Sequence, residues 1–230
     1  MAESKLFTKT AAGLGQVEYL LTNLYIPLAE VEREIPWPKG ERFENDAEHS
    51  FSLAIIGASL GEKYGLNPSK IALYASFHDI HEHISGDTSL LDDEGRQTKK
   101  QREAEAIKTL EVNFQSTPLV ATALKAYESQ IDEESRFVYA LDKLLATMMV
   151  VQDGGRIWKK HGLTFEDYAQ KFGESQRLKI AAHPLVLGWY EELWKKIEAR
   201  KDELFVPSDV ELKKPTVVGV VGIEPTTKRL

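Results

Sequence analysis

Apolar residues recur every three to four positions along most of the chain, the spacing of helices that bury one face. A first helix is predicted over residues 14–31, where the apolar side chains at this spacing are Leu14, Val17, Leu20, Leu21, Leu24, Tyr25 and Leu28. Residues 32–40 hold prolines and a glycine, so we expect no regular structure there. The next helix begins at Asn45, which forms a capping-box pattern with Glu48, and runs to about Tyr64.

Further helices follow by the same criterion, separated by polar turns. Their expected ranges run from Pro68 into residues 78–87, then over 97–113, 116–129, 132–153, 165–172 and 183–204. The segment 97–113 is so highly charged that we expect a surface helix. Residues 217–221 have the composition of a strand, but nothing nearby can pair with them. The chain is therefore predicted to be all-α.

One large hydrophobic core suits a chain of 230 residues. We expect one helical domain over residues 1–205 and an irregular tail over residues 206–230, where prolines and glycines interrupt any helical period. The tail is expected to be dispensable. The alternative is that residues 217–221 add a strand to a partner or pack across a homodimer.

The composition excludes several classes of function. The chain has no cysteine and therefore no disulfide, zinc–thiolate site or thiol nucleophile. Its net charge of -7 argues against non-specific binding to nucleic acid. The sequence has no apolar run of about 18 residues that could span a membrane, and its first residues lack the apolar core of a signal peptide. We expect a cytoplasmic protein with no nucleic-acid or membrane partner.

Residues 78–87 concentrate three histidines, two aspartates and a glutamate at the end of an apolar helix. On a continuous helix His78, Asp79 and Glu82 stand at i, i+1 and i+4, so their side chains converge. A buried imidazole beside a carboxylate is costly unless a cation neutralises the pair, and a divalent metal does so directly. The alternative is a helix end with a solvated cluster of charges.

Two polar residues elsewhere also face the expected core. His49 lies in the first turn of its helix with Leu53 and Ile56 on its own face, so it points inward. Asp142 lies in the middle of an apolar helix, beside Val138 on one face, and needs a partner. That partner is either a metal ion or a buried lysine or arginine. Two imidazoles and two carboxylates suit Mn, Co, Fe, Ni or Zn and leave positions for water and substrate.

The order of these residues along the chain resembles that of the HD-domain metal-dependent phosphohydrolases. A histidine, then a His-Asp pair, then a distal aspartate each fall on a separate helix, at His49, His78-Asp79 and Asp142. The resemblance covers about residues 14–204. It implies an HD-domain helical bundle with one divalent ion, either one of the metals above or Mg, held by these four side chains.

A longer match is similar to the branch with the bacterial 5′-deoxynucleotidases. It comprises residues 42–50, Glu82 and residues 85–87. The resemblance implies that Glu82 and Asp87 are catalytic, with Glu82 orienting or deprotonating the attacking water. An arginine upstream of the first histidine contacts the substrate phosphate in that branch. Arg33 is the candidate here, although the spacing that follows it differs from the family pattern.

Several nearby residues remain open between two roles. Arg42 can bind phosphate or form a salt bridge at the helix start, with Glu44 or Glu48. Trp37 can line the pocket, although a loop tryptophan is more often a packing anchor. His81 and His83 are not part of the family pattern, and we favour a surface position for His83.

The expected function is removal of the 5′-phosphate from (deoxy)nucleoside 5′-monophosphates. The alternatives are hydrolysis of a nucleoside triphosphate, a cyclic or an alarmone nucleotide, or a non-catalytic metal or nucleotide sensor, which would need neither Glu82 nor Asp87. The charge pattern favours a monophosphate, because the cations expected near the site are Arg33, Lys39 and Arg42, enough for one phosphate. The base should be read loosely, since few amide side chains lie nearby.

Overall fold

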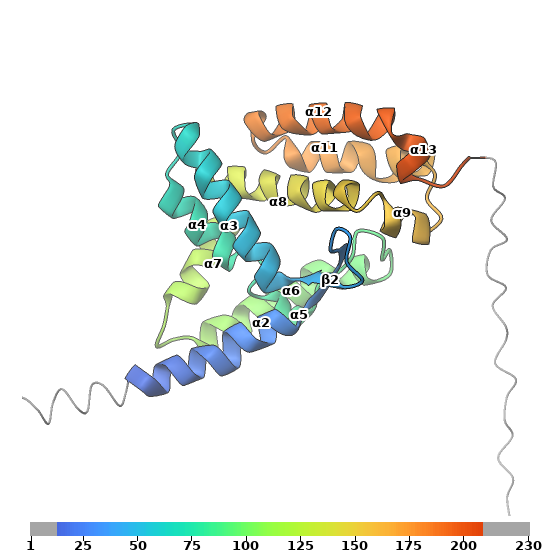
Figure 1. Ribbon diagram of the computed structural model, residues 1–230. Helices are drawn as coiled ribbons and strands as arrows, with labels where there is room; N and C mark the ends of the chain where they lie inside the picture. Colours follow the sequence, from blue (N-terminus) through green and yellow to red (C-terminus); the bar gives the residue numbers. More distant parts are fainter. Residues whose placement is uncertain (1–12, 209–230) are drawn as a thin grey trace, which may run out of the picture.

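A computed structural model describes residues 13–208, and these form a bundle of helices with one short hairpin (Figure 1). The all-α prediction is confirmed. No helix of the described part is both long and apolar enough to cross a membrane. Only residues 206–208 of the expected tail are described, so its predicted dispensability lies outside the described residues.

The first predicted helix is present, with an irregularity in its middle. Residues 13–20 are helical, Leu21–Tyr25 form a π-helical turn (η1), and α2 continues over Ile26–Glu30. Several of its apolar side chains are exposed, among them Leu14 and Tyr25.

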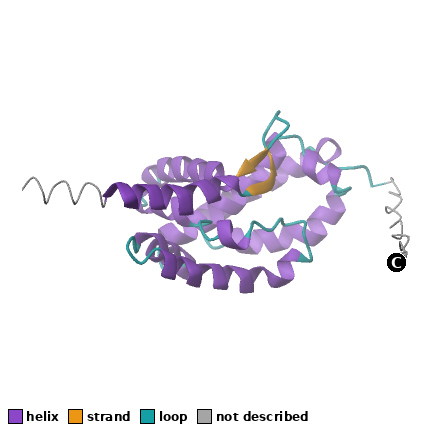
Figure 2. Ribbon diagram, turned by 90° about the horizontal axis from the view of Figure 1, so that it is seen from below, coloured by secondary structure: helices purple, strands orange, loops and turns teal. Residues whose placement is uncertain are grey.

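The expectation of no regular structure over residues 32–40 is wrong for its first half. Strand β1, Glu32–Pro36, pairs antiparallel with β2, Phe43–Asn45, and Figure 2 shows this hairpin in orange. Pro36 is tolerated because it ends its strand, where a missing backbone donor costs little. Instead Trp37 N, one residue on, donates to the carbonyl of Arg42 at 2.9 Å. The hairpin matters because β1 carries Arg33.

Helices α3, Asp46–Lys63, and α4, Pro68–Phe77, form a closely packed pair. The Asn45 capping box opens α3 as predicted, and Asn67 caps α4 by accepting from Lys70 N. A Cβ at Gly61 would meet Cδ1 of the buried Ile71 side chain, which would then have to shift, so the glycine favours this close approach. The pair fixes the spacing between the first histidine and the His-Asp pair.

Helix α8, Glu133–Gln152, runs through the middle of the bundle. It packs against α3, α4 and α7, Leu119–Ser129, with Phe137 and Leu141 in the core. Pro118 is the N-cap of α7 and makes no side-chain cap bond, so this helix begins three residues later than the expected residue 116. The charged helix α6, Gly95–Asn113, packs on α5, Glu82–Ser85, and on α7.

The C-terminal elements stack on α8, as Figure 1 shows for α11 and α12. The bounds are α9 Arg156–Lys160, α10 Phe165–Tyr168, η2 Ala169–Gly173, α11 Glu174–Ile180, α12 Pro184–Ala199 and α13 Lys201–Leu204. The sequence pattern predicted α10 and α12 but missed α11. The reason is that α11 buries a polar side chain, Gln176, beside Ile180, while Leu178 is exposed, so it carries no apolar stripe.

Candidate metal centre and active site

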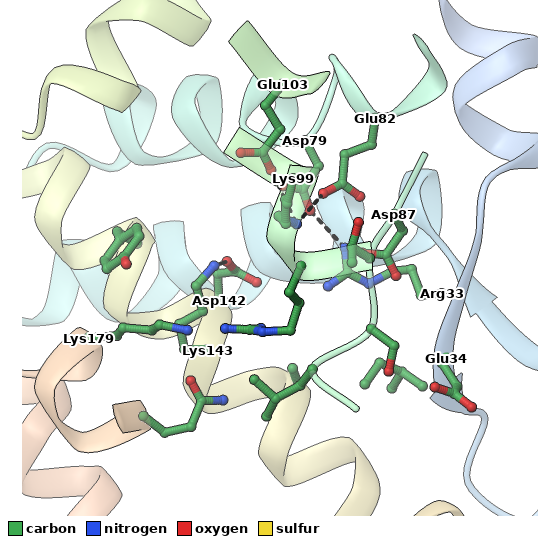
Figure 3. A pocket seen from close by; sticks show the side chains of 18 of the residues that line it. Arg33, Glu34, Asp79, Glu82, Asp87, Lys99, Glu103, Asp142, Lys143 and Lys179 are labelled. Carbon is green, nitrogen blue, oxygen red and sulfur yellow. Dashed lines mark hydrogen bonds and ion pairs between the residues drawn. The ribbon is translucent and has the colours of Figure 1, made fainter. Parts of the chain in front are cut away.

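A cavity of about 720 Å³ opens between α8, α6, α11 and the hairpin (Figure 3). Its wall includes candidate ligands Asp79 and Asp142, the predicted catalytic pair Glu82 and Asp87, and Arg33. Residues from five different segments therefore meet around one space. The sequence analysis predicted that these five residues belong to one site, and in the structure all five line the same cavity.

The four candidate metal ligands lie side by side at one end of this cavity. His49 Nε2 is 2.9 Å from Asp142 Oδ1, and His78 Nε2 is 2.9 Å from Asp79 Oδ2. The two imidazole rings have centroids 5.3 Å apart. One ligand atom each from His49, His78 and Asp79 fall within 4.8 Å of one another, close enough to share an ion. Two helices, α3 and α8, and the turn that follows α4 thus deliver one cluster.

The hydrogen bond on the far side of His78 shows that this cluster suits a metal. His78 Nδ1 donates to the carbonyl of Ala75 at 2.9 Å, which leaves the lone pair on Nε2. That buried Nε2 faces an Asp79 oxygen without a hydrogen bond between them. Two Lewis bases in contact repel each other unless a cation lies between or beside them. The donor set, imidazole and carboxylate, fits a first-row divalent ion.

The position of His49 is set from both sides. Its Nδ1 lies 3.4 Å from Glu44 Oε2, while its Nε2 points to Asp142. Burial and the Arg33 guanidinium lower the pKa of His49, but the hydrogen bonds to Asp142 and Glu44 outweigh them and raise it to about 9. A proton on His49 and a divalent ion are therefore alternative partners for the Asp142 carboxylate.

Arg33 reaches the cluster from β1. Its Nη1 donates to Asp79 Oδ2 at 2.7 Å and to Asp46 Oδ1 at 3.0 Å, and its Nε is buried without a hydrogen-bond partner among the described residues. Burial and the neighbouring Asp79 carboxylate raise the pKa of Asp46 to about 6, with Arg33 opposing them. This Nε lies 3.8 Å from Glu44 Oε2, so the guanidinium balances three carboxylates, those of Glu44, Asp46 and Asp79.

Glu82 and Asp87 lie across from this arginine (Figure 3). Glu82 is buried, one of its oxygens has no partner within residues 13–208, and the other is 3.4 Å from Lys99 Nζ. Burial and the carboxylates of Asp79 and Asp87 raise the pKa of Glu82 well above its usual value. A carboxyl group with a raised pKa is suited to accept and release protons near neutral pH.

The helix expected to carry His78, Asp79 and Glu82 is interrupted. Helix α4 ends at Phe77, residues 78–81 form a turn, and α5 begins at Glu82. Within this turn Glu82 N donates to the carbonyl of Asp79 at 2.8 Å, a tight three-residue bond. The turn brings oxygens of Asp79, Glu82 and Asp46 within 4.8 Å of one another.

Trp37 and Arg42 stand apart from the cavity, and neither is among the residues that line it. The Arg42 guanidinium stacks 4.2 Å from the Trp37 ring and donates to Glu48 at 2.6 Å. Of the two roles left open for Arg42, the structure has the salt bridge at the helix start. Trp37 packs at the hairpin turn and is partly exposed.

Residues 28–182 match the family model described as HD domain. This chain belongs to the HD domain family. The recognition of HD-domain phosphohydrolases from the order of His49, His78-Asp79 and Asp142 is thereby confirmed.

Two known proteins are similar to this HD domain over most of its length. The 5′-deoxynucleotidase hdd1 of Schizosaccharomyces pombe is 26% identical over 182 residues, which are 70% of this chain and 83% of the relative. The crystal structure of a predicted metal-dependent phosphohydrolase from Magnetospirillum magnetotacticum MS-1 has a TM-score of 0.67 and 25% identity. The superposition covers 83% of this chain and 94% of that one.

The HD domain also contains a network of charged side chains that the sequence analysis did not predict. Lys99 Nζ lies 3.2 Å from Glu103 and 3.4 Å from Glu82, and His81 Nε2 is 3.6 Å from Glu103. Helix α6 was expected on the surface, yet this face of it lines the cavity. The i,i+4 spacing of Lys99 and Glu103 is typical of exposed helices as well, so it gave no signal. His83 does not line the cavity and donates to the Ile80 carbonyl instead.

The charge count that favoured a single phosphate is wrong. Lys39 and Arg42 do not line the cavity, but five cations outside the prediction do: Arg96, Lys99, Lys100, Lys143 and Lys179. Lys143 Nζ contacts Asp142 Oδ2. Asp142 therefore has the lysine partner that the sequence left open as an alternative to a metal. The signal for Lys143 was its place next to Asp142 on an otherwise apolar helix.

Proposed function

We propose that this HD domain is a divalent-metal-dependent phosphomonoesterase that removes the 5′-phosphate from (deoxy)nucleoside 5′-monophosphates. The observation that carries the proposal is a single cavity wall with three kinds of group. They are a cluster of metal-ligand type, an arginine, and a buried carboxyl group with a raised pKa. The similarity to a 5′-deoxynucleotidase supports the choice of substrate.

The metal would be held by His49, His78, Asp79 and Asp142. When bound, a divalent ion polarises the phosphoryl group and lowers the pKa of water in the site. The protein supports the ligand set from behind, because Glu44 contacts His49 and the Ala75 carbonyl orients His78. The metal is Mn, Co, Fe, Ni, Zn or Mg.

The side chains around the cluster divide the remaining work. Arg33, which lines the cavity, balances the charge of a phosphate oxygen and keeps Asp79 in place through Nη1. Glu82 accepts a proton from the attacking water as the new phosphorus–oxygen bond forms. The bond between phosphorus and O5′ then breaks, and O5′ takes up a proton from Asp87 or Glu82.

Phosphate release from metal-stripped protein tests this function. The assay adds Mn, Co, Mg or Zn in turn and supplies dAMP, dGMP and dTMP, with cyclic AMP as a comparison. We expect metal-dependent release from the monophosphates and little preference among the bases. No release from any monophosphate with any metal would contradict the proposal and leave the sensor alternative.

A further inference from the structure

The cavity continues past the candidate metal centre along α8. The residues of this helix that line it include Tyr139, Asp142, Ala146 and Val150, whose spacing of three to four puts them on one face. Val150 lies eight residues after Asp142, which is about 12 Å along a helix axis. The cavity of about 720 Å³ therefore has room for more of a substrate than a phosphate held at the metal centre.

The wall formed by the end of α8 and the elements that follow it is mostly apolar. Val150, Ile157, Trp158 and Tyr168 all line the cavity, and each is buried. The rings of Trp158 and Tyr168 pack together with centroids 4.5 Å apart. A wall of this kind suits the flat, apolar faces of a nucleobase, and a few polar groups then fix the orientation of the ligand.

One polar side chain of the cavity wall lacks a partner. Gln176 on α11 is only 6% exposed, and its Oε1 is buried without a hydrogen-bond partner among the described residues. An amide oxygen can only accept hydrogen bonds, so the missing partner is an N–H or O–H group. Buried acceptors in proteins are nearly always paired, so one that faces a ligand cavity is expected to pair with the ligand.

The position of Gln176 along α11 separates it from the metal centre. Helices α8 and α11 lie side by side and run in opposite directions (Figure 1). Figure 3 shows the Lys179 side chain extending toward Asp142. Gln176 lies three residues before Lys179, about 4.5 Å further along the helix axis toward the end of α8. It therefore faces the part of a substrate that follows the phosphate.

From these observations we infer that Gln176 is a specificity-determining residue that accepts a hydrogen bond from the nucleoside part of the substrate. The inference rests on the proposed function, in which the phosphate lies between the metal and Arg33. A nucleoside offers two kinds of donor, an N–H group of the base and the 3′-hydroxyl of the sugar. Each of the four bases carries an N–H group, so a lone acceptor does not distinguish them, in agreement with little preference among the bases.

Binding of nucleotides that each lack one donor tests this contact. The full-length, Mn-loaded chain carries Glu82→Gln to prevent turnover, and calorimetry compares dAMP with two analogues. Purine 2′-deoxyriboside 5′-monophosphate lacks the N–H group of the base, and 2′,3′-dideoxyadenosine 5′-monophosphate lacks the hydroxyl. We expect one of the two to bind about tenfold more weakly than dAMP, the effect of leaving a buried acceptor unpaired. The weaker analogue identifies the donor.

Substitution of Gln176 decides whether the difference comes from this residue. Gln176→Met keeps the size of the side chain but removes the amide oxygen, so it should bind dAMP and the weaker analogue about equally. Gln152→Met is the matched control, since Gln152 is exposed at the end of α8 and does not line the cavity. Thermal melting of each variant verifies folding, and Gln176→Ala replaces Gln176→Met if the latter unfolds.

Equal binding of dAMP and both analogues by the parent chain would overturn the inference, because solvent would then satisfy Gln176. A preference that persists in folded Gln176→Met protein would overturn it as well. No binding of dAMP would overturn the inference together with the choice of substrate. Gln176-dependent binding without phosphate release from dAMP by the wild-type chain would overturn the proposed function alone.

Discussion

Helices α4 and α8 are joined by two ionic clusters of very different character. At one end Lys70 Nζ lies 2.9 Å from Asp132 and 3.2 Å from Glu134, and Tyr74 donates to Asp132 at 2.8 Å. We call this the Lys70 cluster. It is partly exposed, and its cation and anions pair with each other.

The candidate metal centre joins the same two helices further along. Here both histidines and Asp142 are almost fully buried, Asp79 is 14% exposed, and His78 Nε2 has no hydrogen-bond partner among residues 13–208. The Lys70 cluster satisfies its charges within the chain, so it serves structure. In the candidate metal centre Arg33 and Lys143 contact Asp79 and Asp142, but no donor of the described residues reaches the lone pair on His78 Nε2. This lone pair is what suits the cluster to an added cation and distinguishes it from a satisfied salt bridge.

Removing the metal should have the largest effect of all the changes, because it acts on the candidate metal centre and leaves the Lys70 cluster intact. A chelator should abolish phosphate release, because polarisation of the phosphoryl group is worth several kcal/mol. It should also lower the free energy of unfolding by about 2.7 kcal/mol relative to protein in metal at 100 times its Kd. Calorimetric melting with and without metal measures this. An unchanged melting temperature would show that the folded protein does not bind the metal.

Glu82→Gln should lower kcat by on the order of 10²-fold while the metal stays bound, since a positioned general base contributes about that much. Glu94→Gln, in the exposed loop before α6, is the matched control. Steady-state kinetics and elemental analysis on the same samples separate the two effects. Wild-type turnover in Glu82→Gln would remove Glu82 from the mechanism.

Glu44→Gln should weaken metal affinity by about tenfold, because Glu44 supports His49 from the side opposite Asp142. Exposed Glu41→Gln on the hairpin loop should leave affinity unchanged. Competition with a fluorescent chelator gives both dissociation constants. Equal affinities would mean that helix α3 alone positions the histidine.

Asp132→Asn should have the smallest effect on the candidate metal centre, because it changes only the Lys70 cluster. Metal binding and activity should stay the same. Lys70 and the Ser135 backbone N–H lower the pKa of Asp132 to about 2, although burial opposes them. Because the folded pKa lies below the unfolded value of 3.8, the carboxylate stabilises the fold above pH 3.8 and loses this contribution as the pH falls toward 2. The asparagine still caps α8, so we expect a loss of about 1–2 kcal/mol at pH 7 that disappears near pH 2. Urea unfolding at both pH values measures it. A loss that persists at pH 2 would exclude the charge as its cause.

The same contrast explains what the sequence could predict. His49 and Asp142 were recognisable because each polar residue interrupts an apolar face, and the Asn45 and Asp132 caps mark where their helices begin. These signals are local. They fixed the helices that carry the ligands, and with them most of the fold.

The features that the sequence did not predict depend on contacts between distant segments. Arg33 reaches Asp79 only because Pro36 ends strand β1 instead of preventing the hairpin. Lys99 and Lys179 look like ordinary surface residues, and only the packing of α6 and α11 around α8 turns them toward the cavity. Charge alone along the chain could not distinguish the inner face from the outer one.

The metal content of three proteins tests the central claim most directly. Wild-type, Asp142→Ala and Asp132→Asn chains are loaded with Mn, passed through a desalting column and measured by elemental analysis. The account predicts about one ion per chain in wild type and Asp132→Asn, and almost none in Asp142→Ala, because only Asp142 belongs to the candidate metal centre. Full occupancy in a folded Asp142→Ala chain would contradict it.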